Sequence, residues 1–164
     1  MILTPHFIVG AAIGAKTHNL GLIIILGILS HYILDFIPHW DYVNHGIKDF
    51  HKTKDFKALF PDLFKITIDG LIGLLIVFLI VWQKDLLNLN NLIFVILGIF
   101  FSILPDILLF TAIIFGGTLA QKYIDFHHKF LHCSKDKEKE GKITFLNIST
   151  QILIIILSII MFFS

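Results

Sequence analysis

Long apolar stretches alternate with polar segments along the whole chain. Four of them, residues 20–38, 66–82, 92–115 and 145–163, approach the length of about 20 residues with which a helix crosses a bilayer. A fifth, residues 5–15, is shorter and rich in glycine and alanine, which let a helix pack closely on its neighbours. The pattern predicts an all-α, polytopic integral membrane protein. It has about four transmembrane helices and a short N-terminal helix that is re-entrant or buried.

The end of the chain differs from the rest. Residues 145–163 are mostly Ile, Leu and Phe, which is typical of a plain membrane anchor. The polar segment before it, residues 117–142, begins with a pattern that favours an amphipathic helix. We therefore divide the chain into a membrane-embedded domain, residues 1–143, and a C-terminal transmembrane anchor helix, residues 144–164.

The composition agrees with a membrane protein. The 164 residues are 56% hydrophobic and only 15% charged, against about 25% charged in soluble domains. A net charge of +1 gives no reason to expect nucleic acid as a partner. The expected partner is the lipid bilayer, of a bacterial or archaeal cell membrane, and the sequence defines no oligomeric state.

The lysines predict the orientation. All 13 basic residues are lysine, and the segments 41–65 and 117–142 hold five and six of them, whereas the connection 83–91 holds one. Because lysine-rich loops stay in the cytoplasm, both long segments should lie inside and the short connection outside.

The richest candidate site is the segment SHYILDFIPHWDY. His31 and Asp35 are four residues apart, so on a helix they share one face. Pro38 should end that helix, which places His39 and Asp41 in the turn that follows. His and Trp are ordinary at an interfacial helix end, but ionisable residues within an apolar span are costly and usually functional.

Three further apolar stretches carry isolated polar residues. Asp69 lies near the head of its span, where its carboxylate could also reach back to the interface. Asp106 lies deep in an apolar run beside Pro105 and should be protonated, paired or bound to a cation. His6 follows Pro5 near the start of the first stretch and is a weak candidate by itself.

The segment DFHHKFLH holds the last candidates. His128 and His132 are four residues apart and should face together, as in helices that offer two metal ligands, whereas His127 should point about 100° away. No glutamate lies between the pair in the position that a zincin site needs. The plainer interpretation is a basic amphipathic helix at the interface.

The orientation derived from lysines places these residues toward the cytoplasmic half of the protein, and His6 joins them if the first stretch crosses or re-enters from inside. Imidazole and carboxylate together suit zinc, and also manganese or another first-row divalent ion. We expect the metal ligands among the histidines and two of the aspartates, and a general base in one of the two remaining aspartates. The expected ligands are His31, Asp35, Asp106, His128, His39, His132 and His6, and the expected catalytic carboxylates are Asp69 and Asp41.

The order of these motifs resembles a known family. TPH followed by glycines, then SHYILDFIPHWD, a membrane aspartate, LPD and a terminal histidine pair are similar to the predicted membrane-bound metal-dependent hydrolases of the YdjM-like group. The resemblance covers residues 3–132, and the family is distantly similar to zinc-dependent phospholipase C in its use of His and Asp. This chain lacks the family's GHRGxTHS-type segment and has only THN at residues 17–19.

We expect hydrolysis of an ester or phosphoester of a lipid-like substrate at the cytoplasmic side, by water activated on the metal. Two alternatives stay open. A metal or proton transporter would need polar residues that continue to the outer face, and residues 71–81 and 92–101 have almost none. A non-catalytic protein with a structural metal needs only four ligands, fewer than the candidates present.

Overall fold

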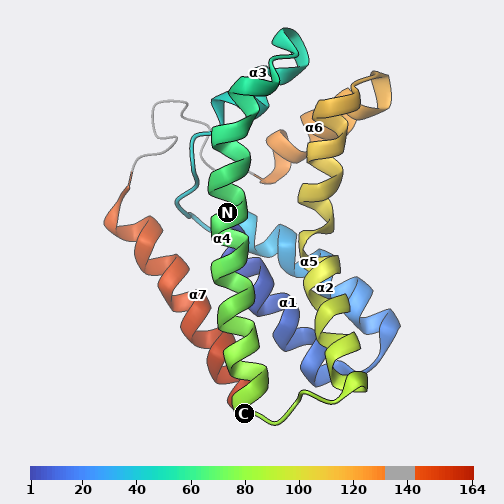
Figure 1. Ribbon diagram of the computed structural model, residues 1–164, viewed down its shortest axis with the longest axis vertical. Coiled ribbons are helices and arrows are strands. Elements are labelled where there is room, and N and C mark those ends of the chain that lie inside the picture. The colour runs from blue at the N-terminus through green and yellow to red at the C-terminus, as the bar shows by residue number, and fades with distance from the viewer. Residues whose placement is uncertain (132–142) are drawn as a thin grey trace.

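The computed structural model describes residues 1–131 and 143–164, apart from the side chains at 51, 52 and 128–131. All regular secondary structure in the described part is helical (Figure 1). The predicted all-α membrane-protein architecture is confirmed. The helices are α1 (Leu3–Thr17), α2 (Leu20–Phe36), α3 (His45–Thr53), α4 (Phe56–Gln83), α5 (Leu89–Phe115), α6 (Thr118–Leu131) and α7 (Phe145–Phe163).

Three helices, α4, α5 and α7, are long and apolar enough to cross a membrane, and α2 is a shorter apolar helix of 17 residues. Their outward faces expose large apolar side chains, among them Leu75, Phe78 and Ile96. A lipid environment solvates such a surface and water does not. These helices therefore form the membrane-embedded part of the protein.

The short first helix lies at the centre of the bundle. Helix α1 packs against α2, α4, α5 and α7, and Ile8, Ala11 and Ala12 on it have no exposed surface. The predicted small-residue face explains how it fits. Gly10 and Gly98 face each other between α1 and α5, and a Cβ on Gly10 would come within 2.5 Å of the Gly98 carbonyl oxygen. Two glycines thus allow the backbones to touch.

Several helices differ from the sequence pattern in length. Helix α4 begins at Phe56, ten residues before the apolar stretch, because its first turns pack on the unpredicted helix α3. Asp62 on α4 accepts a hydrogen bond from the Ile47 backbone near the start of α3. Helix α5 continues through Pro105, although proline removes the bond to the carbonyl four residues earlier.

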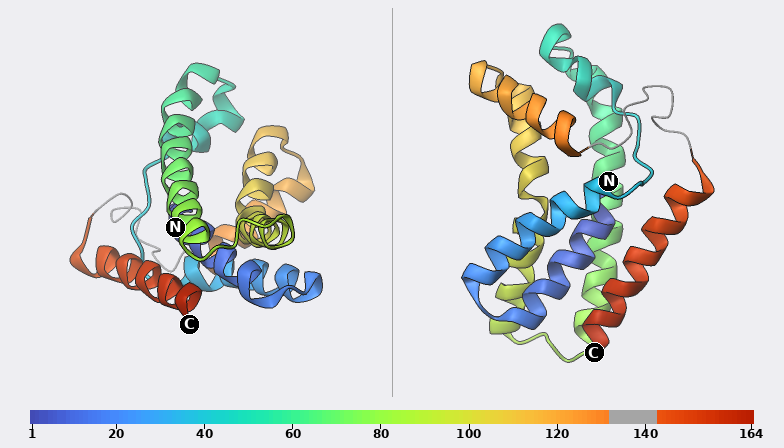
Figure 2. Two further views of the ribbon diagram at one scale, coloured as in Figure 1. Left: turned by 60° about the horizontal axis from the view of Figure 1, so that its bottom comes forward. Right: turned by 180° about the vertical axis from the view of Figure 1, so that it is seen from behind.

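The polar segments gather at one end of the bundle. Figures 1 and 2 show α3 and α6 there, and the C-terminus with the connection between α4 and α5 at the opposite end. Gly116 and Gly117, with φ of 69° and 103°, make the turn from α5 into α6, in a backbone region that glycine enters without strain. This turn returns α6 toward α2, which it contacts. The described parts of the two lysine-rich segments thus share one end, and the side of the membrane stays a prediction.

Helix α7 has polar contacts besides its apolar surface. Gln151 is buried and donates from Nε2 to the Trp40 carbonyl oxygen at 2.6 Å. Thr150 donates to the Pro38 carbonyl oxygen at 2.5 Å. The helix interpreted as an anchor therefore also holds the segment after α2, where His39 and Asp41 lie.

Candidate metal centre

Four side chains from three helices converge at the polar end of the bundle. His31 and Asp35 come from α2, Asp106 from α5 and His127 from α6. One ligand atom of each lies within 4.8 Å of those of the other three. His31 Nε2 is 3.2 Å from Asp35 Oδ2 and 3.7 Å from Asp106 Oδ1, and His127 Nε2 is 4.0 Å from Asp35 Oδ2. These four residues are called the metal group below.

Three of the four residues have almost no contact with solvent. The exposed fractions of the His31, Asp35 and His127 side chains are 0%, 1% and 1%, whereas Asp106 is 31% exposed. The predicted spacing explains the first pair, since His31 and Asp35 lie one turn apart on α2. Asp106 is the open edge of the group, where solvent reaches it.

The orientation of His31 is fixed by the helix opposite. Its Nδ1 lies 2.9 Å from the Ser102 carbonyl oxygen on α5, so Nδ1–H donates this bond. Nε2 then faces two carboxylates and has no hydrogen-bond partner among the described residues. A neutral imidazole would present a lone pair to negative oxygens there. The arrangement needs a proton or a cation, and metal-binding histidines are typically held by such a second bond.

Asp35 lies at the centre of the site, and each of its two oxygens has polar neighbours. Its Oδ2 faces His31 and His127, and its Oδ1 faces His6 Nε2 at 3.3 Å and the α-ammonium nitrogen of Met1 at 2.8 Å. The rings of His6 and His31 stack with their centroids 4.5 Å apart. The weak candidate His6 is thereby brought to the site by the central helix α1.

The segment after α2 forms the edge of the site. Asp41 is 33% exposed, and its Oδ2 lies 3.6 Å from the Met1 nitrogen. Burial would lower the pKa of this α-ammonium group, but Asp41, Asp35 and Asp106 together raise it to about 11. Burial and the same ammonium charge lower the pKa of His39 to about 4. The Nδ1–H of His39 donates to the Ile37 carbonyl oxygen at 2.7 Å.

Asp69 has a different environment. Its Oδ2 accepts hydrogen bonds from the Leu3 and Thr4 backbone N–H groups and from the Tyr42 hydroxyl, and its Oδ1 accepts one from the Thr4 hydroxyl. Burial and the bond to Asp69 raise the pKa of Tyr42, so the phenol stays protonated and donates. Asp69 thus caps the start of α1 and holds the segment after α2, and both of its carboxylate oxygens accept hydrogen bonds.

One member of the metal group was not expected from the sequence. We expected His128 and His132 to be the ligands, but His127 is the histidine of α6 that joins the group. The side chain of His128 and all of His132 lie outside the described residues. In the sequence, Tyr123, one turn before His127, is the residue that marks the face of α6 on which His127 lies. It is an aromatic residue of the same face, its ring centroid lies 6.1 Å from that of His127, and it donates to the Pro105 carbonyl oxygen.

The residues fit a divalent metal ion. Two imidazoles and two carboxylates are ligand types that zinc and other first-row divalent ions take. The buried Nε2 of His31 and both ring nitrogens of His6 have no hydrogen-bond partner among the described residues. A buried polar atom without a partner costs about 1–3 kcal/mol. The ligand atoms, their burial and the ring nitrogens without hydrogen-bond partners therefore all fit a site that can hold a metal ion.

Comparisons with protein-family models, curated proteins and solved structures find no match for this chain. The function is therefore argued from the site and the membrane-embedded fold.

Proposed function

We propose that the protein is a membrane-bound, metal-dependent hydrolase that cleaves an ester or phosphoester in a lipid-like substrate. The observation that carries the proposal is the metal group: two imidazoles and two carboxylates at the polar end of an otherwise apolar bundle. The resemblance of the SHYILDFIPHWD segment implies the same activity. By the lysine distribution the site faces the cytoplasm.

A divalent ion bound there would supply Lewis-acid polarisation of the scissile group and lower the pKa of water toward neutrality. The residues of this chain would hold and orient it. Asp35 and His31 would bind from one face of α2, His127 from α6, and Ser102 would fix the His31 ring through its carbonyl oxygen. Asp106, at the open edge, would bind while facing the substrate.

The two expected catalytic carboxylates, Asp69 and Asp41, differ in how accessible they are to a substrate. Asp69 is 8% exposed and accepts four hydrogen bonds, so protonation would disrupt the cap of α1. Asp41 is 33% exposed at the edge of the site. Asp41 is therefore the one that we propose to face the substrate and the attacking water.

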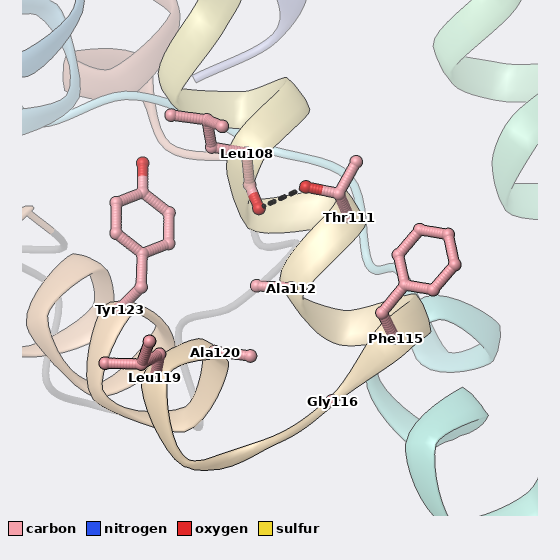
Figure 3. Close-up of a pocket in the computed structure, with 8 residues that line it drawn as sticks. All are labelled: Leu108, Thr111, Ala112, Phe115, Gly116, Leu119, Ala120 and Tyr123. Atoms are coloured by element: carbon pink, nitrogen blue, oxygen red, sulfur yellow. Dashed lines mark hydrogen bonds between the residues drawn. The ribbon is translucent and has the colours of Figure 1, made fainter.

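An apolar groove beside the site supports a substrate with an acyl chain. It lies between α5 and α6, has a volume of about 350 Å³ and is open to its surroundings. Figure 3 shows its lining, which includes Leu108, two residues after Asp106, and Tyr123, one turn before His127. A lipid chain that lay in this groove would contact Tyr123, whose ring centroid lies 6.1 Å from that of His127 in the metal group.

The proposal is tested by hydrolysis assays on the purified protein in mixed micelles. The probes are a phosphatidylcholine and the p-nitrophenyl esters of a fatty acid and of an alkyl phosphate. We expect turnover of at least one probe, loss of turnover with a chelator, and recovery with zinc or manganese. His31→Ala should abolish turnover together with bound metal.

His45→Ala is the matched control, because His45 is an exposed histidine at the start of α3. It should keep both turnover and metal. Undiminished turnover in His31→Ala, or a metal-loaded wild-type protein that cleaves none of the probes, would refute the hydrolase assignment.

A further inference from the structure

Gln151 is a polar residue within the helix that the sequence presents as a plain anchor. It lies on the second turn of α7, and only 4% of it is exposed. Polar side chains in a membrane-spanning helix are costly, and they usually pair with another polar group of the protein. The partner here is the backbone of a distant segment, because Gln151 Nε2 donates to the Trp40 carbonyl oxygen at 2.6 Å. Gln151 therefore serves the segment after α2.

That segment, residues 37–44, has no regular secondary structure. In a membrane protein such backbone depends on protein groups or water to satisfy its N–H and C=O groups. Gln151 does this for Trp40. The Thr150 hydroxyl also reaches the Pro38 carbonyl oxygen, but its single proton is shared with two carbonyl groups of its own helix, each 3.0 Å away. Gln151 is therefore the main polar contact by which α7 holds the segment.

Asp41 lies between two residues that are each held by a different helix. The Trp40 carbonyl accepts the bond from Gln151 of α7. The Tyr42 hydroxyl donates to Asp69 of α4 at 2.6 Å. The Asp41 side chain is held as well, because its Oδ1 accepts the Tyr42 backbone N–H at 2.8 Å, and its Oδ2 lies on the side of the buried N-terminal ammonium group. Both the backbone and the carboxylate of Asp41 are thus fixed.

We propose that Gln151 is a positioning residue for Asp41 and that α7 is thereby part of the site. This inference rests on the proposed function, in which Asp41 faces the substrate and the attacking water. Gln151 contacts neither of them and acts through the Trp40 carbonyl oxygen. A reacting group must be held within about 0.5 Å of its productive position, and a displacement of about 1 Å can lower a rate by about 100-fold. The bond from Gln151 prevents such a displacement at the residue next to Asp41.

The simpler interpretation is that Gln151 only fastens α7 to the bundle. Helix α7 already packs on the core and against α1 through apolar side chains, among them Phe162, Ile155 and Ile159. Gln151 is not part of this apolar packing. An apolar residue of similar size at position 151 should therefore leave α7 in place and release only the segment.

The test follows the segment independently of the reaction. Trp40 and Trp82 are the two tryptophans of the chain, so a Trp82→Phe background leaves Trp40 as the only one. In the purified full chain in mixed micelles, Gln151→Met should lower the fluorescence anisotropy of Trp40 and raise its quenching by acrylamide about twofold or more. Zinc affinity should stay within about threefold of the wild type, because the metal group has no member in residues 37–44.

The reaction is followed with the probe that the wild type cleaves fastest. Gln151→Met should lower kcat by about 10–100-fold and leave KM within about threefold. In an Asp41→Asn background, where kcat is already low, Gln151→Met should cause little further loss, because it acts through Asp41. A residue that only fastened α7 would lower the amount of folded protein, and kcat per zinc-loaded chain would stay unchanged.

Ser158→Ala is the matched control. Ser158 is another buried polar residue of α7, but its hydroxyl donates within the helix, to the Ile154 carbonyl oxygen at 2.7 Å. This variant should keep the Trp40 anisotropy, the zinc affinity and kcat.

The outcomes separate this inference from the proposed function. An unchanged Trp40 signal in Gln151→Met would overturn the positioning role. An unchanged kcat would do the same, and so would losses of kcat that multiply in the double variant with Asp41→Asn. A wild type that cleaves no probe would refute the hydrolase assignment and with it the part of Gln151 in the reaction, whereas the Trp40 signal would still decide whether Gln151 holds the segment.

Discussion

Asp35 and Asp69 are both buried carboxylates on apolar helices, with exposed fractions of 1% and 8%, yet their surroundings differ. Every polar neighbour of Asp69 given above is a neutral donor: two backbone N–H groups and two hydroxyls. The polar neighbours of Asp35 are three imidazoles and an ammonium group. One carboxylate is stabilised by hydrogen bonds and the other by groups that carry or attract positive charge.

The difference separates a structural aspartate from a functional one. A buried carboxylate that accepts several hydrogen bonds from neutral donors is already stabilised by them without a cation. A carboxylate that faces imidazoles gains most when a metal ion replaces their protons. Asp69 therefore holds α1 and Tyr42 in place, and Asp35 is the carboxylate that we propose to hold the ion.

The largest expected effect comes from removing the charge of Asp35. Loss of an outer partner already weakens metal binding by about 10–100-fold, so Asp35→Asn should lower zinc affinity by more than about 100-fold. Competition with a chelating dye measures it. Asp69→Asn should stay within a few-fold of the wild type, and an equal loss in both variants would erase the distinction between the two carboxylates.

The next effect concerns the stability of the metal-free protein. Asp69→Asn places an amide among four donors and should lower the free energy of unfolding by about 2 kcal/mol, the scale of hydrogen bonds to a charged group. Unfolding in mixed micelles with increasing denaturing detergent measures it. Asp49→Asn, at an exposed position on α3, should change little. If Asp69→Asn had the same free energy of unfolding as that control, the hydrogen bonds of Asp69 to α1 would not stabilise the protein.

A third effect is the pH dependence of zinc binding. The metal takes neutral imidazole, so protons compete with it below the ordinary histidine pKa of about 6.5. Affinity should be constant above that pH and fall by about tenfold or more per unit below it. The rise in melting temperature caused by zinc should disappear over the same window. A zinc-induced rise that is the same at pH 5.5 and 7.5 would argue against imidazole ligands.

The smallest effect tests one bond of the Asp69 cap. Tyr42→Phe removes one of four hydrogen bonds and should destabilise the metal-free protein by about 1 kcal/mol. The measurement is the same detergent titration. Zinc affinity should change by less than threefold. A loss of zinc affinity larger than threefold would place Tyr42 in the metal site itself.

The sequence predicts the fold class from the lengths of its apolar stretches, and it predicts the pairing of His31 with Asp35 from helical periodicity. It does not predict that His127 joins the metal group. The direction of the His127 side chain depends on the rotation of α6, which follows from the Gly116–Gly117 turn and the packing of α5. The role of Asp69 was hidden for a similar reason. A carboxylate in the middle of α4 meets the first turn of α1 only after the bundle has formed.

The most direct test of the account is X-ray absorption at the zinc edge, on wild-type protein loaded with one equivalent of zinc. The metal group predicts nitrogen and oxygen ligands at about 2.0–2.2 Å, with the outer-shell scattering of imidazole rings. His31→Ala should lose that spectrum together with the zinc, whereas His45→Ala should keep it. A wild-type spectrum without imidazole scattering, or protein that retains no zinc, would contradict the claim that these histidines and aspartates form a metal centre.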